Sequence, residues 1–195
     1  MSKNSQKKDD KHPVILITGG AGFLGRNIVK ELLGPDSMLQ AREIRVFDQQ
    51  PYTGEYKQQV NFISGDVRDS ECIIAVSKGV DLIIHCAAII DWGTKDEDEV
   101  LAVNVGGTEN VIEACRENNI KNLIFTSSLD AVYTGKPLAH INEAHPYPTS
   151  KQNAYCRSKT LSEKAIKKVN SEELRTCILR PSDIYGEEDP FHIQP

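Results

Sequence analysis

Three glycines at regular spacing near the start of the chain constrain its fold more than any other feature. They are Gly19, Gly22 and Gly25. An apolar, largely β-branched segment, Val14–Thr18, precedes them, and Phe23–Leu33 follows with the apolar spacing of a helix. In this context G-x-x-G-x-x-G predicts a sharp strand–turn–helix unit in which the backbone closely approaches a bound pyrophosphate. The pyrophosphate of a dinucleotide is expected on the free N–H groups at the helix N-terminus.

The rest of the chain alternates between strand-like and helix-like segments. Further strands are predicted over residues 43–48, 60–64, 81–86, 122–126 and 175–179, and further helices over 97–117 and 149–169. This alternation predicts an α/β fold with a Rossmann-like, doubly wound parallel sheet and helices on both faces. We expect one domain over residues 13–195, preceded by a disordered, charged tail at 1–12.

Composition excludes several classes of protein. A formal net charge of −5 disfavours a general nucleic-acid binder, which needs a basic face. The five cysteines are scattered without the spacing of a metal site, so we expect no metal and a reducing compartment. The polar N-terminus is no secretory signal, and no apolar run approaches the roughly 18 residues of a membrane span. These features predict a cytoplasmic protein.

Asp48 ends the second predicted strand and bears on the choice of dinucleotide. A carboxylate at this place accepts hydrogen bonds from both adenosine ribose hydroxyls and repels a 2′-phosphate. Arg45 lies inside the strand, where it does not offset that repulsion. The sequence therefore predicts NAD as the cofactor, with NADP disfavoured.

Tyr155 and Lys159 are one helical turn apart and share a helix face. Tyrosine has an ordinary pKa near 10, and a nearby ammonium group together with a cationic nicotinamide ring favours its phenolate. Ser127 and Ser128 follow the fifth strand, at the sheet edge where α/β proteins bind ligands. We prefer Ser128 because the strand is expected to end just before it. Ser128, Tyr155 and Lys159 are thus the predicted catalytic residues.

A second Y-x-x-x-K pattern lies eight residues upstream, at Tyr147 and Lys151. Pro148 makes this segment poor helix interior and restricts the backbone of Tyr147. Tyr147 and Lys151 are therefore expected before and at the start of the helix. This pair stays open as the alternative to Tyr155 and Lys159.

Taken together, these motifs resemble the extended short-chain dehydrogenase/reductase family from Val14 to about Pro190. In chain order, the resemblance rests on TGGAGFLG at 18–25, GDVRD at 65–69, HCAA at 85–88, NVGGT at 104–108 and LRPSDIYG at 179–186. It implies that Asp66 and Val67 contact the adenine and that Asn104 belongs to the active-site architecture. His85 is read as a core histidine, not as a catalytic one. The cofactor-binding residues predicted in this way, together with those above, are Gly19, Gly22, Phe23, Leu24, Gly25, Asp48, Asp66, Val67, Ala87, Ala88, Asn104, Tyr155, Lys159, Pro181 and Ile184.

Within that family the chain is similar to the 3β-hydroxysteroid dehydrogenase group. The similarity rests on FTSS at 125–128, NEAHPYP at 142–148, RVFD at 45–48 and AIID at 88–91. The spacing from Ser128 to Tyr155 resembles the sterol-4-carboxylate 3-dehydrogenase branch, whereas Tyr147 to Lys151 resembles the Y-P-x-S-K box of the steroid dehydrogenase/isomerase branch. The branch therefore stays open.

The resemblance implies NAD-dependent oxidation of the CH–OH group of a 3β-hydroxysteroid or sterol, with Tyr155 as acid/base. It also implies homodimer formation through the helices 97–117 and 149–169, and association of full-length relatives with the endoplasmic reticulum membrane. The family places most of its substrate-binding region beyond Pro195, so we expect the C-terminal substrate lobe to be largely absent. A nucleotide-sugar epimerase or dehydratase, and a weakly catalytic NAD-binding interaction module, are the alternatives.

Overall fold

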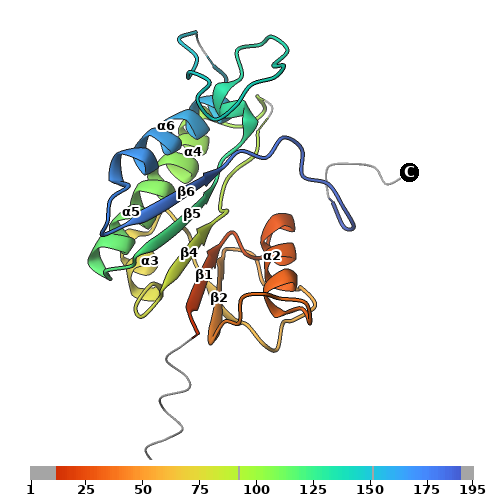
Figure 1. Ribbon diagram of the computed structural model, residues 1–195, viewed down its shortest axis with the longest axis vertical. Coiled ribbons are helices and arrows are strands. Elements are labelled where there is room, and N and C mark those ends of the chain that lie inside the picture. The colour runs from red at the N-terminus through yellow and green to blue at the C-terminus, as the bar shows by residue number, and fades with distance from the viewer. Residues whose placement is uncertain (1–11, 92, 151, 190–195) are drawn as a thin grey trace, which may run out of the picture.

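The computed structural model describes residues 12–91, 93–150 and 152–189 (Figure 1). Within them, six strands form one sheet in the order β3-β2-β1-β4-β5-β6, and every pair is parallel. The strands are β1 (Val14–Thr18), β2 (Glu43–Asp48), β3 (Asn61–Ser64), β4 (Leu82–His85), β5 (Asn122–Thr126) and β6 (Arg175–Leu179). The predicted doubly wound parallel sheet is confirmed.

Helices cover both faces of this sheet, as predicted. Successive side chains of a strand point to opposite faces, and in β1 Leu16 packs in a core with Val111 of α5 and Ile166 of α6, whereas Ile17 packs in a core with Val29 of α2. Figure 1 shows α2 on one side of the sheet and α3, α5 and α6 on the other. The bounds are α2 (Phe23–Leu33), α3 (Ser70–Val76), α4 (Glu97–Leu101), α5 (Gly107–Glu117) and α6 (Ala154–Val169).

Two predicted helices differ from those observed. The helix expected from residue 149 begins at Ala154, because the Asn153 side chain caps it by accepting a hydrogen bond of 2.8 Å from the Cys156 N–H. The run 97–117 is helical throughout, but its middle, Ala102–Gly106, is a π-helical turn between α4 and α5. There the Thr108 hydroxyl donates to the carbonyl oxygen of residue 104 one turn earlier, a bond that disturbs a regular helix.

Smaller differences concern element ends and short helices. β3 and β4 are one and two residues shorter than predicted, at 61–64 and 82–85. The prediction missed α3, which Asp69 caps by accepting from the Cys72 N–H, and a 3₁₀ turn at Leu129–Val132. The tail predicted to be disordered lies outside the described residues except for His12.

The strand order fixes where a ligand binds. β1 leads outward to β2 and β3 on one side, and the chain then returns to continue through β4, β5 and β6 on the other. In sheets of this kind the loops after β1 and β4 leave in opposite directions and open a crevice at the carboxyl ends of the strands. The glycine turn lies at this switch point.

Candidate active site

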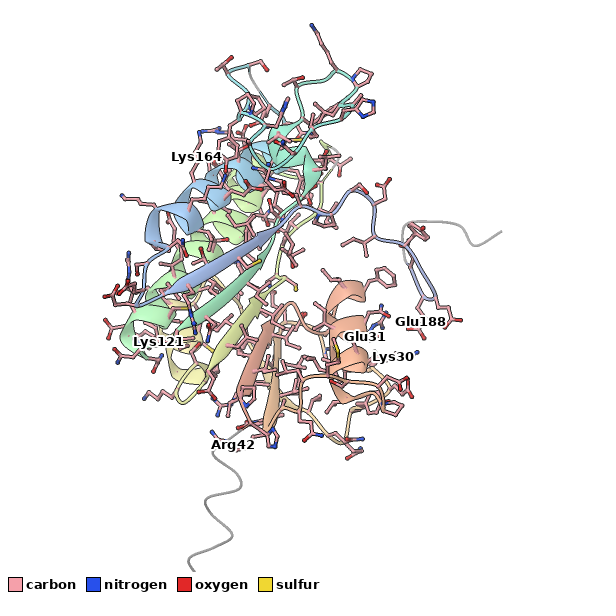
Figure 2. All side chains as sticks on the ribbon, in the orientation of Figure 1. Lys30, Glu31, Arg42, Lys121, Lys164 and Glu188 are labelled. Atoms are coloured by element: carbon pink, nitrogen blue, oxygen red, sulfur yellow. The ribbon has the colours of Figure 1, made fainter. Side chains whose placement is uncertain are left out.

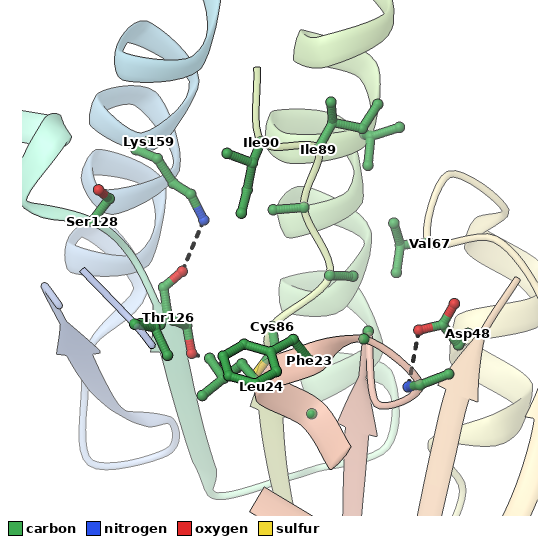
Figure 3. A pocket seen from close by; sticks show the side chains of 18 of the residues that line it. Phe23, Leu24, Asp48, Val67, Cys86, Ile89, Ile90, Thr126, Ser128 and Lys159 are labelled. Atoms are coloured by element: carbon green, nitrogen blue, oxygen red, sulfur yellow. Dashed lines mark hydrogen bonds between the residues drawn. The ribbon is translucent and has the colours of Figure 1, made fainter. Parts of the chain in front are cut away.

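A cleft of about 650 Å³ lies at the carboxyl ends of the strands (Figure 3). Its volume is within the range of ordinary cofactor sites. Segments that follow all six strands contribute to its lining, and so do Tyr155 and Lys159 of α6. Of the residues predicted from the sequence, those that line it are Gly19, Gly22, Phe23, Leu24, Gly25, Asp48, Val67, Ala87, Ala88, Ser128, Tyr155, Lys159, Pro181 and Ile184.

The geometry of the glycine turn suits the pyrophosphate of a dinucleotide. Gly19 has a φ of +68°, and a Cβ there would lie 2.6 Å from the Ala87 nitrogen. A Cβ on Gly25 would lie 2.4 Å from the Gly19 oxygen, so helix α2 packs directly on the turn. A Cβ on Gly22 would meet only the Gly19 oxygen, at 3.3 Å, and would otherwise occupy the open cleft. Gly22 thus keeps free the space that a phosphate needs.

Asp48 is fixed against this turn. Its Oδ2 accepts a hydrogen bond of 3.1 Å from the Ala21 N–H, and its Oδ1 accepts one of 2.9 Å from the Gln50 N–H (Figure 3). A carboxylate has about four lone-pair sites, so capacity remains for ribose hydroxyls. Arg45 turns elsewhere, to Glu43 and to backbone carbonyls of residues 76 and 78. The cleft therefore presents a negative group at the end of β2.

Two predicted cofactor residues, Asp66 and Asn104, do not line the cleft. Asp66 accepts hydrogen bonds from the guanidinium group of Arg68 and from its backbone N–H, and these bonds, the guanidinium first, hold the pKa of the Asp66 carboxyl below the ordinary value. Arg68 itself lines the cleft.

Asn104 is buried in the π-helical turn and connects three segments. Its side chain accepts from the Ile89 N–H at 2.7 Å, donates to the Ile89 carbonyl at 3.0 Å, and donates to the Ser158 hydroxyl at 2.9 Å. Ile89 lines the cleft, so Asn104 joins the cleft wall to α6. Its contact with the cleft is thus indirect.

The three predicted catalytic residues come together at one end of the cleft. The Lys159 ammonium lies 5.8 Å from the centre of the Tyr155 ring. It donates a hydrogen bond of 2.9 Å to the Thr126 carbonyl (Figure 3). The Ser128 hydroxyl donates to the Asp130 carboxylate and accepts from the Asp130 N–H, both at 3.0 Å. Asp130 therefore orients this hydroxyl at the cleft.

Burial dominates the titration of this site. It raises the pKa of Tyr155 to about 12, against a smaller lowering by the Ser128 hydroxyl. It also lowers the pKa of Lys159 to about 8. We expected Lys159 to lower the pKa of Tyr155. In this arrangement the ammonium is bound to a backbone carbonyl, and burial of the phenol outweighs any such effect.

The alternative residues are held by a buried carboxylate. The Ser127 hydroxyl donates to Glu163 at 2.6 Å, and the Tyr147 hydroxyl donates to the same carboxylate at 2.7 Å. Ser127 also lines the cleft, Tyr147 does not, and Lys151 lies outside the described residues. Sequence reasoning missed Glu163, although it lies four residues after Lys159 and so shares its helix face.

His85 is a core histidine, as we read it from the sequence. Its ring nitrogens lie 2.6 Å from the Thr18 hydroxyl and 3.1 Å from the Thr108 hydroxyl. Complete burial lowers its pKa to about 3, so the ring is neutral at physiological pH. In the described part of the chain, no cluster of three potential metal ligands occurs. No helix there combines the length and the apolar character needed to cross a bilayer.

The model of the 3-beta hydroxysteroid dehydrogenase/isomerase family matches residues 16–195. The chain belongs to this family. It is 39% identical over 188 residues to a 3 beta-hydroxysteroid dehydrogenase/Delta 5→4-isomerase of vaccinia virus, covering 90% of this chain and 54% of the viral protein. It is 38% identical over 189 residues to the human 3 beta-hydroxysteroid dehydrogenase type 7, covering 89% of this chain and 51% of that protein. The family member described here thus spans about half the length of these relatives.

Solved structures of the short-chain dehydrogenase/reductase superfamily have the same fold. A superfamily protein from Agrobacterium tumefaciens with bound NAD superposes with a TM-score of 0.72 and 28% identity, over 86% of this chain and 48% of that one. A UDP-glucose 4-epimerase from Brucella ovis in complex with NAD gives 0.71 and 29%, over 86% and 51%. The predicted family and fold class are both confirmed.

Proposed function

We propose that this chain is the cofactor-binding and catalytic half of an NAD-dependent dehydrogenase that oxidises the CH–OH group of a 3β-hydroxysteroid or sterol. One observation carries the proposal: the glycine turn and the three residues Ser128, Tyr155 and Lys159 line the same cleft. The names of the relatives at 35–39% identity support the steroid class. The proposed partner of the cleft, besides NAD, is thus a small-molecule substrate.

Each catalytic residue has a role that follows from its chemistry. Tyr155, as phenolate, removes the proton of the substrate hydroxyl, while the Ser128 hydroxyl binds the reacting oxygen. Lys159 supplies positive charge beside Tyr155 and binds the nicotinamide ribose. Bound NAD supplies the hydride acceptor and a positive charge that favours the phenolate. General acid–base catalysis of this kind contributes about 10²–10⁴-fold, and positioning contributes much of the rest.

NAD rather than NADP follows from charge. The Asp48 carboxylate faces the cleft with two backbone N–H groups fixing its orientation. A 2′-phosphate next to it would meet like charge in a partly enclosed site. The bound NAD of two structural neighbours supports NAD as the cofactor.

The nucleotide-sugar epimerase is the second candidate, favoured by neighbours that carry this name at 27–29% identity. The sequence relatives at 35–39% identity favour the steroid class over it. A non-catalytic NAD-binding module is the third candidate. The cytoplasm as location, endoplasmic reticulum association of longer relatives and homodimer formation remain predictions.

One experiment separates these functions. NAD binding is measured by titration, and NADH formation is followed with a panel of 3β-hydroxysteroids. Conversion of nucleotide sugars is followed by product analysis, because an epimerase returns the hydride to the sugar and releases no NADH. Both assays use this chain and a version extended to the length of its relatives. We expect NAD binding by both and NADH formation with steroids by the extended version. Binding without turnover in either would indicate the module, and turnover of nucleotide sugars alone would indicate the epimerase.

Two tyrosine variants test the assignment of the base. Tyr155→Phe is expected to abolish NADH formation while NAD binding survives. Tyr147→Phe, the matched control with the same atom removed, is expected to retain most turnover. The reverse result would move the role to Tyr147.

A further inference from the structure

Helix α6 presents three functional side chains at successive turns of one face. Tyr155, Lys159 and Glu163 are spaced four residues apart, which places them in one row along the helix. Lys159 donates to the Thr126 carbonyl and Glu163 accepts from the Ser127 hydroxyl. The end of β5 is thus fixed to α6 at two consecutive residues, immediately before Ser128.

The Glu163 carboxylate is fully buried and fully used. Its exposed fraction is 0%, and its two oxygens accept four hydrogen bonds. Two come from the Arg180 guanidinium, at 2.8 and 2.7 Å, and the others come from Ser127 and Tyr147. The bidentate pairing neutralises the charge and fixes its direction.

Arg180 connects this carboxylate to the cofactor side of the cleft. It directly follows β6 and precedes Pro181, which lines the cleft. Backbone bonds from the Ser127 N–H to the Leu179 carbonyl and from the Leu129 N–H to the Pro181 carbonyl, at 2.7 and 2.9 Å, join the two strand ends. A movement of Arg180 is therefore transmitted to both sides of Ser128.

Tyr147 donates one of the four hydrogen bonds that the Glu163 carboxylate accepts. Its ring lies 5.2 Å from the Lys164 ammonium, 4.8 Å from that of Lys167 and 5.6 Å from the Arg180 guanidinium carbon (Figure 2 labels Lys164 on α6). Cations near an aromatic face attract it. These contacts hold the segment that precedes α6 onto the helix, and they direct the phenol to Glu163 instead of the cleft.

We propose that Glu163 is a positioning residue, which through Ser127 and Arg180 sets Ser128 and Pro181 at fixed places relative to Tyr155 and Lys159. Tyr147 donates the remaining hydrogen bond to the Glu163 carboxylate and so keeps that carboxylate in place. The proposal rests on the proposed function for its consequences in catalysis. It assigns a role to the second tyrosine motif that the dehydrogenase reaction leaves unused.

Stability alone does not account for the arrangement. Replacing a buried ion pair by apolar side chains of similar volume is often neutral or stabilising, whereas removing one partner leaves a buried charge and is strongly destabilising. A buried pair that touches three chain segments beside the catalytic residues is better explained by the geometry it imposes. This difference gives a way to separate the two roles.

The test compares Glu163→Gln with the double variant Glu163→Leu/Arg180→Met. Glu163→Gln is expected to lose thermal stability, because Arg180 keeps its charge without a partner. The double variant is expected to regain wild-type stability within a few degrees. In both variants we expect kcat to fall 10- to 100-fold, with a smaller change in the Kd for NAD. Recovery of kcat together with stability in the double variant would overturn the proposal, because it would assign a purely structural role.

A second readout does not depend on turnover. Tyrosine is labelled with ¹³C at Cζ, and the Tyr155 resonance is identified by its loss in Tyr155→Phe. We expect this resonance to shift in the stable double variant, because Ser128 and the strand ends move relative to the ring. The control is Arg157→Gln, which removes a surface ion pair of 2.7 Å between Arg157 of α6 and Glu97 of α4. This variant is expected to leave the Tyr155 resonance unchanged.

An unchanged Tyr155 resonance in the double variant would overturn the positioning role even if the chain turns over no steroid. If the wild-type chain lacks activity but the resonance shifts, the proposed function fails and the positioning role stands. The two inferences are thus tested separately.

Discussion

The Lys159 ammonium donates a hydrogen bond of 2.9 Å to the carbonyl oxygen of Thr126, the last residue of β5. The ammonium is almost completely enclosed, and the acceptor is a neutral backbone group. Burial therefore outweighs the attraction of the Glu163 carboxylate and lowers the pKa of Lys159 to about 8. The site keeps a positive charge beside Tyr155 at neutral pH, at a cost to folding.

Replacing Lys159 by methionine should remove the destabilisation that comes from burying its ammonium group. The lowered pKa corresponds to about 3 kcal/mol, and leaving the Thr126 carbonyl without its donor costs about 1 kcal/mol. We expect Lys159→Met to raise the free energy of unfolding by about 2 kcal/mol at pH 7, while NADH formation is lost.

The stability that Lys159→Met gains over the wild type should decrease at high pH. An unfolded lysine binds a proton up to about pH 10.5, and the folded one only up to about 8, so the penalty is complete below pH 8. The advantage of the methionine variant should therefore shrink as pH rises from 8 to 10.5. Urea unfolding at several pH values measures this, and a constant difference would contradict it.

Gly22 and Gly25 should respond differently to the same substitution. Gly25→Ala places a methyl group 2.4 Å from backbone atoms of the turn and is expected to destabilise the fold by about 2 kcal/mol or more. Gly22→Ala directs its methyl group into the cleft, so thermal stability should change little while NAD binding weakens at least tenfold. Gly106→Ala, where the new Cβ has open space, is the control for both measurements. Equal loss of NAD binding and stability in Gly22→Ala would count against the cleft as a pyrophosphate site.

Asp48 should decide between the two dinucleotides. Asp48→Asn keeps an oxygen that can accept from the Ala21 or Gln50 N–H but removes the charge that a 2′-phosphate would meet. We expect the ratio of NADP to NAD affinity to rise at least tenfold, as measured by two titrations. An unchanged ratio would mean that the preference is set elsewhere.

His85 should make the protein sensitive to mild acid. Burial keeps its folded pKa at about 3, below its ordinary 6.5, so the unfolded chain binds a proton that the folded one does not. The resulting stability is complete above pH 6.5 and is lost as pH falls toward 3. Between pH 7 and 5 this single group accounts for about 2 kcal/mol of lost stability.

The variant His85→Gln removes that titration and keeps a side chain able to bond Thr18 or Thr108. We expect its free energy of unfolding to fall about 2 kcal/mol less than that of the wild type between pH 7 and 5. Equal losses in urea unfolding would show that His85 does not carry the acid sensitivity.

The sequence predicted the sheet well because its signals are local. Buried parallel strands are short apolar runs, and the glycine spacing of the first turn has few alternatives. The start of α6 was placed five residues early because a proline suggested it, whereas the capping side chain of Asn153 decided it. The π-helical turn between α4 and α5 was not predicted. It depends on hydrogen bonds that the Asn104 carbonyl accepts from the Thr108 hydroxyl and from the Ser162 hydroxyl of α6.

The candidate site divides in the same way. Residue types and spacings alone determined the glycine turn, the acid at the end of β2 and the two rival Y-x-x-x-K motifs. Only the tertiary structure decided that Tyr155 faces the cleft and that the buried Glu163 carboxylate accepts its hydrogen bond from Ser127. Glu163 is separated from Ser127, Tyr147 and Arg180 by 36, 16 and 17 residues, so no local pattern reveals their contact. Hydrogen bonds of this length require side chains that only the packing of α6 against the strand ends brings together.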